Sequence, residues 1–408
     1  MFMSSDAGLT DPYDPVRLCE TVSMLRHLAV NLPAPFRLCL LAPTEPGAAV
    51  ASAESRQATQ RAISAALARI GVDAVRFLHN GETQLSSFEM FISKKICASL
   101  DFAYDRFDSV ERLECFEQFL QGFDFSGALP QIETQVLKTW DGTPLTVYAS
   151  TGRHLPAVVL VLPCGMPFDL CRDWFVALSA HYFVLTWETR GLFGECAAFD
   201  QIALDTPAQV GDLIAVMRAF EVDDAHWMGI CGGAVIALCA AAAHGERVRS
   251  LSLWHGDYNL GDNDLRTRHQ QNFQWLMETA AQDRAEARDL QAMFIDQATL
   301  ATTPEAIAHV ALLPYVNPEL FYRYARVNDA LNNTELLPLL QRIGVPTLVV
   351  AGDNDQTTHI GGSRLIAQSI PGARLHIEQG GSHLAFFESP APSRATARAF
   401  IDAPLEHA

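Results

Sequence analysis

The sequence predicts an α/β protein built on a mainly parallel sheet, and three observations support this fold class. Short apolar runs rich in β-branched residues recur along the last two thirds of the chain, and segments with helical spacing separate them. Continuous apolar strands of this kind are typical of parallel sheets covered on both faces. At residues 225–236, AHWMGICGGAVI, an apolar run also passes into an alanine-rich run through a glycine-rich turn.

The predicted elements follow one another in a regular order from residue 131 onward. Two strand-like runs flank Asp141 and Gly142, a dipeptide that favours a short hairpin. Helices are predicted at residues 207–220, with Thr206 as the N-cap, and at residues 232–243. The remaining strands are predicted at residues 157–162, 183–187, 227–230, 248–254 and 347–351.

We divide the chain into two domains. Residues 131–408 form the α/β domain, and residues 1–130 form a small α/β or mostly helical domain to which no motif assigns a role. In this first domain, strands at residues 36–42 and 72–78 flank a helix at about 53–70, and residues 86–123 form one or two helices.

The α/β domain is expected to carry a helical cap at about residues 255–346, because roughly 90 residues separate two predicted strands there, far more than a usual connection. Such an insertion overhangs the carboxyl ends of the strands, where ligands bind. Its large apolar residues either roof a channel for the substrate or pack the cap on the sheet. They are Phe273, Trp275, Leu276, Met293, Phe294, Phe321, Tyr322 and Tyr324.

Composition excludes several classes of protein. The 29 Lys and Arg residues against 47 Asp and Glu residues give a net charge of −18, which disfavours nucleic acid as a partner. The longest apolar run, residues 234–243, is too short to span a membrane, and the N-terminus lacks the pattern of a signal peptide. Nine cysteines without a CxxC pair fit neither a disulfide framework nor a zinc site. We therefore expect a cytoplasmic protein without a metal or organic cofactor.

The turn GICGG at residues 229–233 makes Cys231 the candidate nucleophile. It matches the G-x-S-x-G elbow, in which a sharp turn between a strand and a helix presents the nucleophile above the sheet, with a thiol in place of the hydroxyl. A cysteine beside a sheet is more often a small buried apolar residue. The combination of strand, elbow and alanine-rich helix favours the catalytic interpretation.

An acid and a histidine follow the elbow in the chain order that this kind of triad requires. Asp355 comes just after the strand at residues 347–351, and His383 lies in the glycine-led segment GGSHLAFFE. His383 would take the thiol proton, while Asp355 would orient the imidazole. Asp353 and Asp257 are the alternative acids. We expect protonated His383 and the helix N-terminus to lower the pKa of Cys231.

Two backbone amides are predicted to form an oxyanion hole. The amide of Gly232 follows the nucleophile directly, and the amide of Met166 lies in PCGMP, residues 163–167, just after a strand. Cys164 is expected to line the site rather than to react. PCGMP is also compatible with an ordinary turn between a strand and a helix.

Residues 131–408 resemble α/β-hydrolase-fold proteins through PCGMP, WETRG at residues 187–191, GICGG, GDND and GGSH. The cysteine elbow together with GMPF and TWETRG is further similar to Dieckmann cyclases of polyketide and nonribosomal-peptide antibiotic biosynthesis. That resemblance implies that Cys231 takes an acyl chain from the phosphopantetheine arm of a carrier protein. A carbanion then closes a tetramic acid or pyridone ring and expels the thiol.

Other activities are compatible with the same Cys, His and Asp residues. A thioesterase, an acyltransferase or a lactone hydrolase would use them, and a noncatalytic binding protein could keep the fold. A thiol nucleophile suits acyl transfer, because exchange between two thioesters is nearly neutral in energy. An acidic carrier would need a basic docking surface, for which Lys94, Lys95, Arg266 and Arg268 are the clustered candidates. The sequence predicts no oligomeric state.

Overall fold

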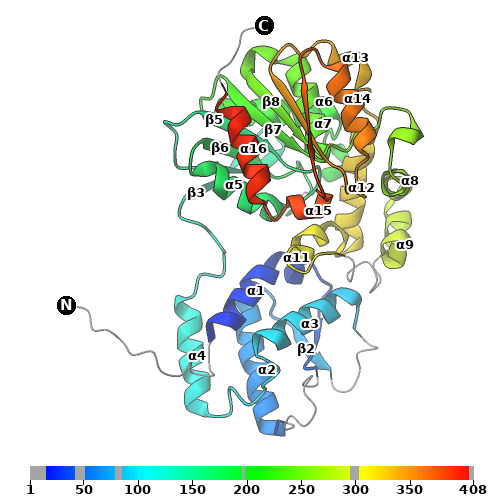
Figure 1. Cartoon of the computed structure of the whole chain (residues 1–408). Helices are drawn as coiled ribbons and strands as arrows, with labels where there is room; N and C mark the ends of the chain where they lie inside the picture. The colour runs from blue at the N-terminus through cyan, green and yellow to red at the C-terminus, as the bar shows by residue number, and fades with distance from the viewer. Residues whose placement is uncertain (1–14, 42–50, 79–84, 195–197, 295–302, 404–408) are drawn as a thin grey trace, which may run out of the picture. The chain divides into compact units, whose positions relative to one another are not determined.

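The computed structural model describes residues 15–41, 51–78, 85–194, 198–294 and 303–403. The chain separates into two compact units, residues 1–128 and 129–408, a division close to the boundary expected at residue 130. Figure 1 shows both units, and each is described here by itself. No helix in the described part of the chain combines the length and the apolar character needed to cross a membrane.

In its described residues, the first unit packs four helices around two short parallel strands. Each of the three later helices begins after a serine whose hydroxyl accepts a backbone amide, as expected for an N-cap. The predicted strands and the central helix are confirmed, whereas the first helix was not anticipated. The elements are α1 Pro15–Val30, β1 Phe36–Cys39, α2 Ala53–Ala68, β2 Val75–Leu78, α3 Ser87–Ser99 and α4 Val110–Gly122.

An eight-stranded sheet, in the order β10-β9-β8-β7-β5-β6-β4-β3, forms the centre of the described part of the second unit. The predicted hairpin around Asp141 and Gly142 supplies the two antiparallel strands, and the other strands pair in parallel. The fold class is therefore confirmed. The strands are β3 Ile132–Lys138, β4 Pro144–Ser150, β5 Ala157–Val161, β6 Phe183–Trp187, β7 Ala225–Ile230, β8 Val248–Trp254, β9 Thr347–Gly352 and β10 Arg374–Glu378.

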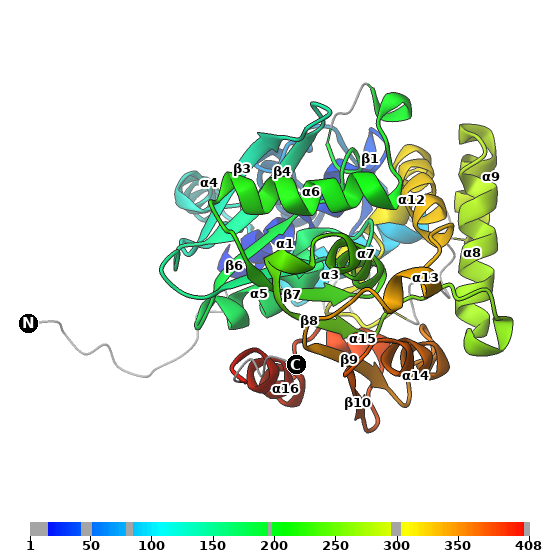
Figure 2. The same cartoon turned by 90° about the horizontal axis from the view of Figure 1, so that it is seen from above.

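Helices cover both faces of this sheet, as Figure 2 shows. On one face α5 Arg172–Ser179 and α16 Ala391–Ile401 bury Trp174, Phe175 and Phe400 against the strands. The opposite face carries α6 Thr206–Ala219, α7 Gly232–Ala243 and α14 Ile360–Ser369. The expected N-cap of α6 was wrong by one residue: the Asp205 carboxylate, not Thr206, accepts the Ala208 amide.

A helical cap lies between β8 and β9, as predicted from the length of the insertion. Its helices are α8 Arg268–Ala280, α9 Arg284–Phe294, α11 Ala308–Ala311, α12 Pro318–Asn332 and α13 Leu337–Leu340. The remaining elements are α15 His383–Phe386 and the short helices η2 Phe168–Cys171, η3 Phe199–Gln201, η4 Gly245–Arg247, η5 Asn263–Leu265 and η6 Leu313–Tyr315.

The apolar residues of the cap have different roles. Phe273 and Tyr324 line a cavity above the sheet, as the channel hypothesis requires. Leu276, Phe321 and Tyr322 are buried in packing within the cap, and Trp275 and Met293 are exposed at its surface. The side chain of Phe294 lies outside the described residues.

Candidate active site

Cys231 occupies a sharp turn between β7 and α7. Its φ of 52° and ψ of −121° are rare for a residue with a side chain, and such strain is typical of functional positions. A Cβ atom on Gly233 would lie 2.3 Å from the carbonyl oxygens of Val161 and Leu162, so only glycine permits α7 to approach β5 this closely. The turn has the geometry of the predicted nucleophile elbow.

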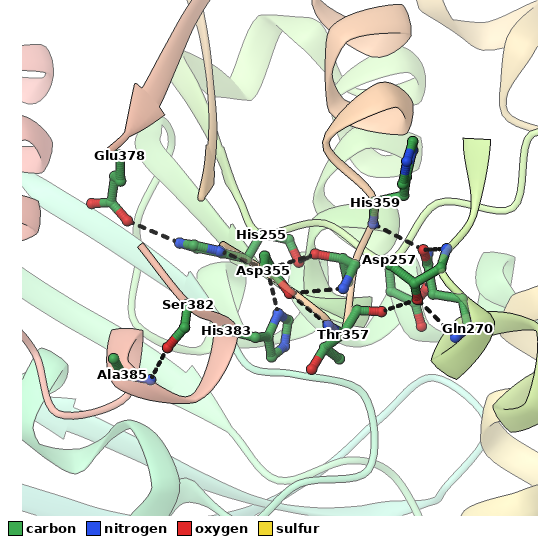
Figure 3. Close-up of polar contacts among 12 residues, drawn as sticks. His255, Asp257, Gln270, Asp355, Thr357, His359, Glu378, Ser382, His383 and Ala385 are labelled. Carbon is green, nitrogen blue, oxygen red and sulfur yellow. Dashed lines mark hydrogen bonds and ion pairs between the residues drawn. The ribbon is translucent and has the colours of Figure 1, made fainter. Parts of the chain in front are cut away.

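His383 and Asp355 are in direct contact at the carboxyl edge of the sheet. Nδ1 of His383 lies 3.0 Å from Oδ2 of Asp355, as Figure 3 shows. The other carboxylate oxygen of Asp355 accepts the amides of Thr357 and Thr358, each at 2.8 Å. With Nδ1 engaged by a carboxylate, Nε2 of His383 is the ring nitrogen available to act as a base.

The two alternative acids have other partners. Asp353 accepts the amide of Gly380 at 2.6 Å, and Oδ1 of Asp257 accepts the side-chain amide of Gln270 at 2.7 Å. Among the carboxylates considered from the sequence, Asp355 is therefore the one that the described structure joins to His383. The catalytic roles themselves stay predictions.

Aromatic packing fixes the segment that carries His383. Ser382 caps α15 by accepting the amide of Ala385, so His383 is the first residue of this short helix. The indole of Trp174 stacks on the ring of Phe386 at 4.7 Å and donates a hydrogen bond to the Phe386 carbonyl at 2.8 Å. The buried indole of Trp174, on α5, thus helps to set the position of the segment that carries the imidazole.

A second histidine, which sequence reasoning missed, contacts the same acid. His255 directly follows β8, has a φ of 47° and is buried. Its Nδ1 lies 3.0 Å from Oδ2 of Asp355, and its Nε2 lies 3.0 Å from Oε2 of Glu378 (Figure 3). Burial alone would lower the pKa of His255, but hydrogen bonds to two carboxylates outweigh it and raise that pKa. Both ring nitrogens of His255 thus face carboxylate oxygens, the arrangement in which an imidazolium donates to each.

His255, Asp355 and His383 could be considered as metal ligands, since their donor atoms lie within 4.8 Å of one another. However, each imidazole Nδ1 lies 3.0 Å from Oδ2 of Asp355, which is the length of a hydrogen bond. A ligating histidine needs a free lone pair on the nitrogen that faces the ion. We therefore interpret the cluster as a network of hydrogen bonds.

A cavity of about 600 Å³ brings the predicted residues together beneath the cap. Cys231, His383, Gly232 and Met166 all line it, and Asp257 lines it beside them. Most of the remaining wall is apolar or aromatic, with Leu170, Phe273, Leu312, Tyr315, Tyr324, Leu384 and Phe387. Such a pocket excludes water from an acyl group while leaving a few polar groups to orient it.

The two predicted oxyanion donors differ in their present bonding. The amide of Gly232 donates to the thiol of Cys231, which favours the charged form of the sulfur. The amide of Met166 instead closes a turn by donating to the carbonyl of Pro163 at 3.0 Å. An oxyanion would have to share or replace that turn bond, and the role of Met166 as an oxyanion donor stays a prediction.

The WETRG segment supports the loop that carries Met166. Oε1 of Glu188 accepts the Phe168 amide at 3.0 Å, and the Thr189 hydroxyl accepts the Gly165 amide at 2.9 Å. Burial raises the pKa of Glu188 to about 8. Arg190 is fully buried and forms ion pairs with Asp212 at 2.8 Å and Asp141 at 2.9 Å, which ties the loop to α6 and to the hairpin.

The expected lowering of the Cys231 pKa was wrong in direction. Enclosure by the surrounding protein raises the pKa of the thiol well above its usual value, and the carboxylate of Asp257 raises it further. The hydrogen bond from the Gly232 amide acts in the opposite sense but does not compensate. The thiol is therefore neutral before substrate binds, and it needs a base to remove its proton during attack.

Comparison with known proteins agrees with the fold described above. A family model described as "alpha/beta hydrolase fold" matches residues 158–390. The 3-oxoadipate enol-lactonase 1 of Acinetobacter baylyi is 22% identical over 274 residues, covering 64% of this chain and 94% of the lactonase. The L-allo-isoleucyltransferase of Pseudomonas savastanoi pv. glycinea is 28% identical over 237 residues, covering 57% of this chain and 81% of the transferase.

Solved structures show the same fold. A hydrolase from Pseudomonas aeruginosa PA01 superposes with a TM-score of 0.54 at 24% identity, over 66% of this chain and 99% of the hydrolase. The enol-lactonase from Burkholderia xenovorans LB400 superposes with a TM-score of 0.52 at 22% identity, over 66% of this chain and 100% of the lactonase.

Proposed function

Because the chain belongs to the α/β-hydrolase-fold family, we propose that it is an acyl-transfer enzyme in which Cys231 carries the acyl group as a thioester. One observation carries this proposal: the cysteine sits at a strained elbow and shares an enclosed, largely apolar cavity with a histidine that is hydrogen-bonded to a buried carboxylate. A neutral thiol, a base and an orienting acid are the groups that covalent acyl transfer requires.

The reaction proceeds in two balanced steps. Nε2 of His383 takes the thiol proton as Sγ of Cys231 attacks the acyl carbonyl, and Asp355 stabilises the imidazolium that forms. The amide of Gly232 stabilises the oxyanion. The tetrahedral intermediate collapses, the bond to the donor sulfur breaks, and the imidazolium protonates the departing thiolate. In the second step His383 takes a proton from the acceptor, which attacks the Cys231 thioester and releases the thiol.

The identity of the acceptor separates the candidate activities. The names of the similar proteins include a transferase and lactonases, so transfer to a second nucleophile and hydrolysis are both supported by relatives. We favour transfer because a thioester exchanges readily with another thiol, and because the mostly apolar wall limits the access of water. An aminoacyl or acyl group would then pass from one phosphopantetheine thiol to another.

Dieckmann ring closure is the narrower form of this proposal. It uses the same acyl-enzyme, but a carbanion within the acyl chain attacks the thioester and His383 removes the acidic proton between two carbonyls. Its support is the similarity of GICGG, GMPF and TWETRG to such cyclases. The relatives found by comparison carry no cyclase name.

Mass spectrometry of the intact protein tests the proposal. The chain is incubated with acyl and aminoacyl N-acetylcysteamine thioesters, and we expect a mass increase equal to the acyl group, located on Cys231 by peptide mapping. A Cys231→Ala variant is the control and should stay unmodified.

Added pantetheine should then release an acyl-pantetheine if the enzyme is a transferase. A released acid indicates a hydrolase, and a ring product from a β-ketoamide thioester indicates a cyclase. Equal modification of the alanine variant would contradict covalent catalysis at Cys231.

A further inference from the structure

Asp257 is a carboxylate in the same cavity that the acyl-transfer mechanism does not use. It is the third residue after β8, and its amide donates to the Cys231 carbonyl at 3.3 Å, so it is tied to the elbow itself. Its side chain lines the cavity beside the thiol. The residues that line this cavity include no lysine or arginine within the described parts of the chain. Asp257 therefore brings a negative charge to the nucleophile with no fixed cation to balance it.

Gln270 holds this carboxylate in place. Oε1 of Gln270 accepts the amides of Thr267 at 3.0 Å and His359 at 2.9 Å, which fixes the orientation of the side-chain amide. Its NH₂ group must then face Asp257, where it donates to Oδ1 at 2.7 Å (Figure 3). Gln270 is only 2% exposed, so this arrangement is rigid. Within the described residues no group donates to the other oxygen of Asp257.

The aromatic wall adds a second feature that suits a cation. Tyr324 contacts Phe273 edge to face at 6.0 Å and Tyr315 edge to face at 5.4 Å, and all three line the cavity with Asp257. Aromatic faces attract ammonium groups, most strongly where water is excluded. A carboxylate with a free oxygen beside several aromatic rings is a suitable site for a small organic cation.

We infer that Asp257 binds the α-ammonium group of an aminoacyl thioester and thereby places the acyl carbonyl at Cys231. The proposal rests on the proposed function and specifies its substrate class. In an aminoacyl thioester the ammonium group is attached to the carbon next to the carbonyl, so an acid adjoining the nucleophile has the right position to bind it. The apolar and aromatic wall then accepts the side chain of the amino acid.

Binding of the ammonium group also changes the nucleophile. The charge of Asp257 opposes formation of a thiolate at Cys231, and a bound ammonium group cancels that charge. Proton transfer to His383 therefore becomes easier only when the correct substrate is present. The other titratable groups around the thiol are Cys164, Tyr258, His269, Tyr315, Tyr324, Asp355 and His383. Burial by the surrounding protein lowers the pKa of His269, which disfavours the charged form of this histidine.

Two matched thioesters and two matched variants test the inference. The thioesters of L-valine and of 3-methylbutanoic acid with N-acetylcysteamine share one carbon skeleton and differ only in the ammonium group. Asp257→Asn keeps the acceptor for Gln270 and removes the charge. Asp223→Asn makes the same change of charge at an exposed residue just before β7, at the opposite edge of the sheet.

The rate of Cys231 acylation is measured for each thioester and each variant at pH 6.5, where the α-amino group of the valyl thioester is protonated. We expect the native chain to prefer the valyl thioester, and Asp257→Asn to lower kcat/KM for that substrate by about 10- to 100-fold, the effect of losing one charge-assisted hydrogen bond. Acylation by the 3-methylbutanoyl thioester should stay the same or become faster. Asp223→Asn should match the native chain. Equal losses with both thioesters, or no preference in the native chain, would overturn the inference.

A binding measurement separates this inference from the proposed function. The rate of Cys231 alkylation by iodoacetamide is followed by peptide mapping at pH 6.5, where the α-amino group of L-valinamide is protonated, with and without this compound, which cannot acylate the thiol. L-valinamide should raise the rate of alkylation in the native chain and leave it unchanged in Asp257→Asn. If no thioester acylates Cys231, acyl transfer fails while faster alkylation with L-valinamide still supports the cation site. Absence of that increase in the native chain would refute the site, whatever the thioesters do.

Discussion

His255 and Asp355 are hydrogen-bonded at 3.0 Å, through the same carboxylate oxygen that accepts from the candidate catalytic base. On its other side His255 contacts Glu378 at 3.0 Å. An imidazolium between two carboxylates compensates charges that would otherwise be buried without partners. The orientation of Asp355, and through it that of His383, therefore depends on a residue that does not line the cavity.

We predict that His255→Gln destabilises the fold strongly. The change leaves Asp355 and Glu378 without their cationic partner, and breaking a buried ion pair in this way typically costs about 3–5 kcal/mol in the free energy of unfolding. Urea denaturation at pH 6 measures the loss. The double variant His255→Gln, Glu378→Gln should recover part of it, because it also removes one unpaired charge. Strictly additive losses would contradict an ionic role for His255.

The contribution of His255 should also depend on pH. The pKa of His255 is raised in the folded chain. Its contribution to the free energy of unfolding is therefore fully present below its unfolded pKa of about 6.5 and is lost as the pH rises through its folded pKa. The difference in stability between the native chain and His255→Gln should therefore shrink from pH 6 to pH 9. His226 is a suitable control, because burial lowers its pKa to about 4 and its partner is the hydroxyl of Ser250. The difference between the native chain and His226→Gln should not shrink over this range.

Low pH should also weaken this hydrogen-bond network, because it protonates the carboxylates of Glu378 and Asp355. Burial opposes ionisation of Glu378, but its hydrogen bonds to His255 and Ser393 outweigh burial and lower its pKa. Burial also opposes ionisation of Asp355, and its hydrogen bonds to His255 and His383 lower its pKa in the same way. Stabilisation by these carboxylates is present above their unfolded pKa values, near 4, and is lost as the pH falls through the lower folded values. Urea denaturation of the native chain from pH 5 to pH 2 should show this decline, and Glu378→Gln should show a smaller one. Equal declines would count against the assignment to Glu378.

The close approach at the elbow gives a further prediction. Gly233→Ala places a methyl group within 2.3 Å of two backbone carbonyl oxygens, which cannot move aside without shifting β5, so we expect a loss of about 3 kcal/mol or more. Gly245→Ala is the matched control, because nothing lies within 4 Å of its new methyl group. It should change stability by no more than about 0.5 kcal/mol. Thermal denaturation compares the two variants, and equal effects would mean that the elbow tolerates a side chain.

The parts of the site that the sequence predicted are those with a local pattern. Cys231 stands in a recognisable turn, Asp355 follows a predicted strand, and His383 follows a glycine pair. The role of His255 depends instead on the neighbouring order β10-β9-β8, which brings Glu378 and Asp355 to either side of it. The strand that ends at Glu378 was missed because it is a partly exposed edge strand with alternating charged residues.

The pKa of Cys231 could not be predicted from the elbow alone. A helix N-terminus and a nearby histidine favour a thiolate and so lower the pKa of a cysteine. Burial of the thiol and the charge of Asp257 instead raise the pKa of Cys231. Both depend on the fold of the domain rather than on the five residues of the turn. The loop turn that engages the Met166 amide is likewise set by contacts from Glu188 and Thr189, which directly follow β6.

The last prediction concerns docking of a carrier protein, for which the candidate basic residues are not equivalent. Lys94 and Lys95 belong to the first unit. Arg266 donates to Gln274 and to the Gln270 carbonyl, so its replacement would disturb the cap as well as any docking surface. Arg268, the exposed first residue of α8, is therefore the residue of this set in the second unit that tests docking most directly.

Arg268→Glu should slow acylation of Cys231 by a carrier-bound substrate several-fold at low salt, because acidic carriers are attracted to positive charge over distances that salt screens. The effect should shrink at 0.5 M salt, and reaction with a small soluble thioester should stay unchanged. Arg288→Glu reverses the charge of another exposed cap residue, on α9, and serves as the control. If Arg268→Glu slows both substrates equally, the arginine supports the cap or the cavity. If Arg288→Glu slows the carrier-bound substrate as much, the attraction comes from overall charge and not from a docking site at the start of α8.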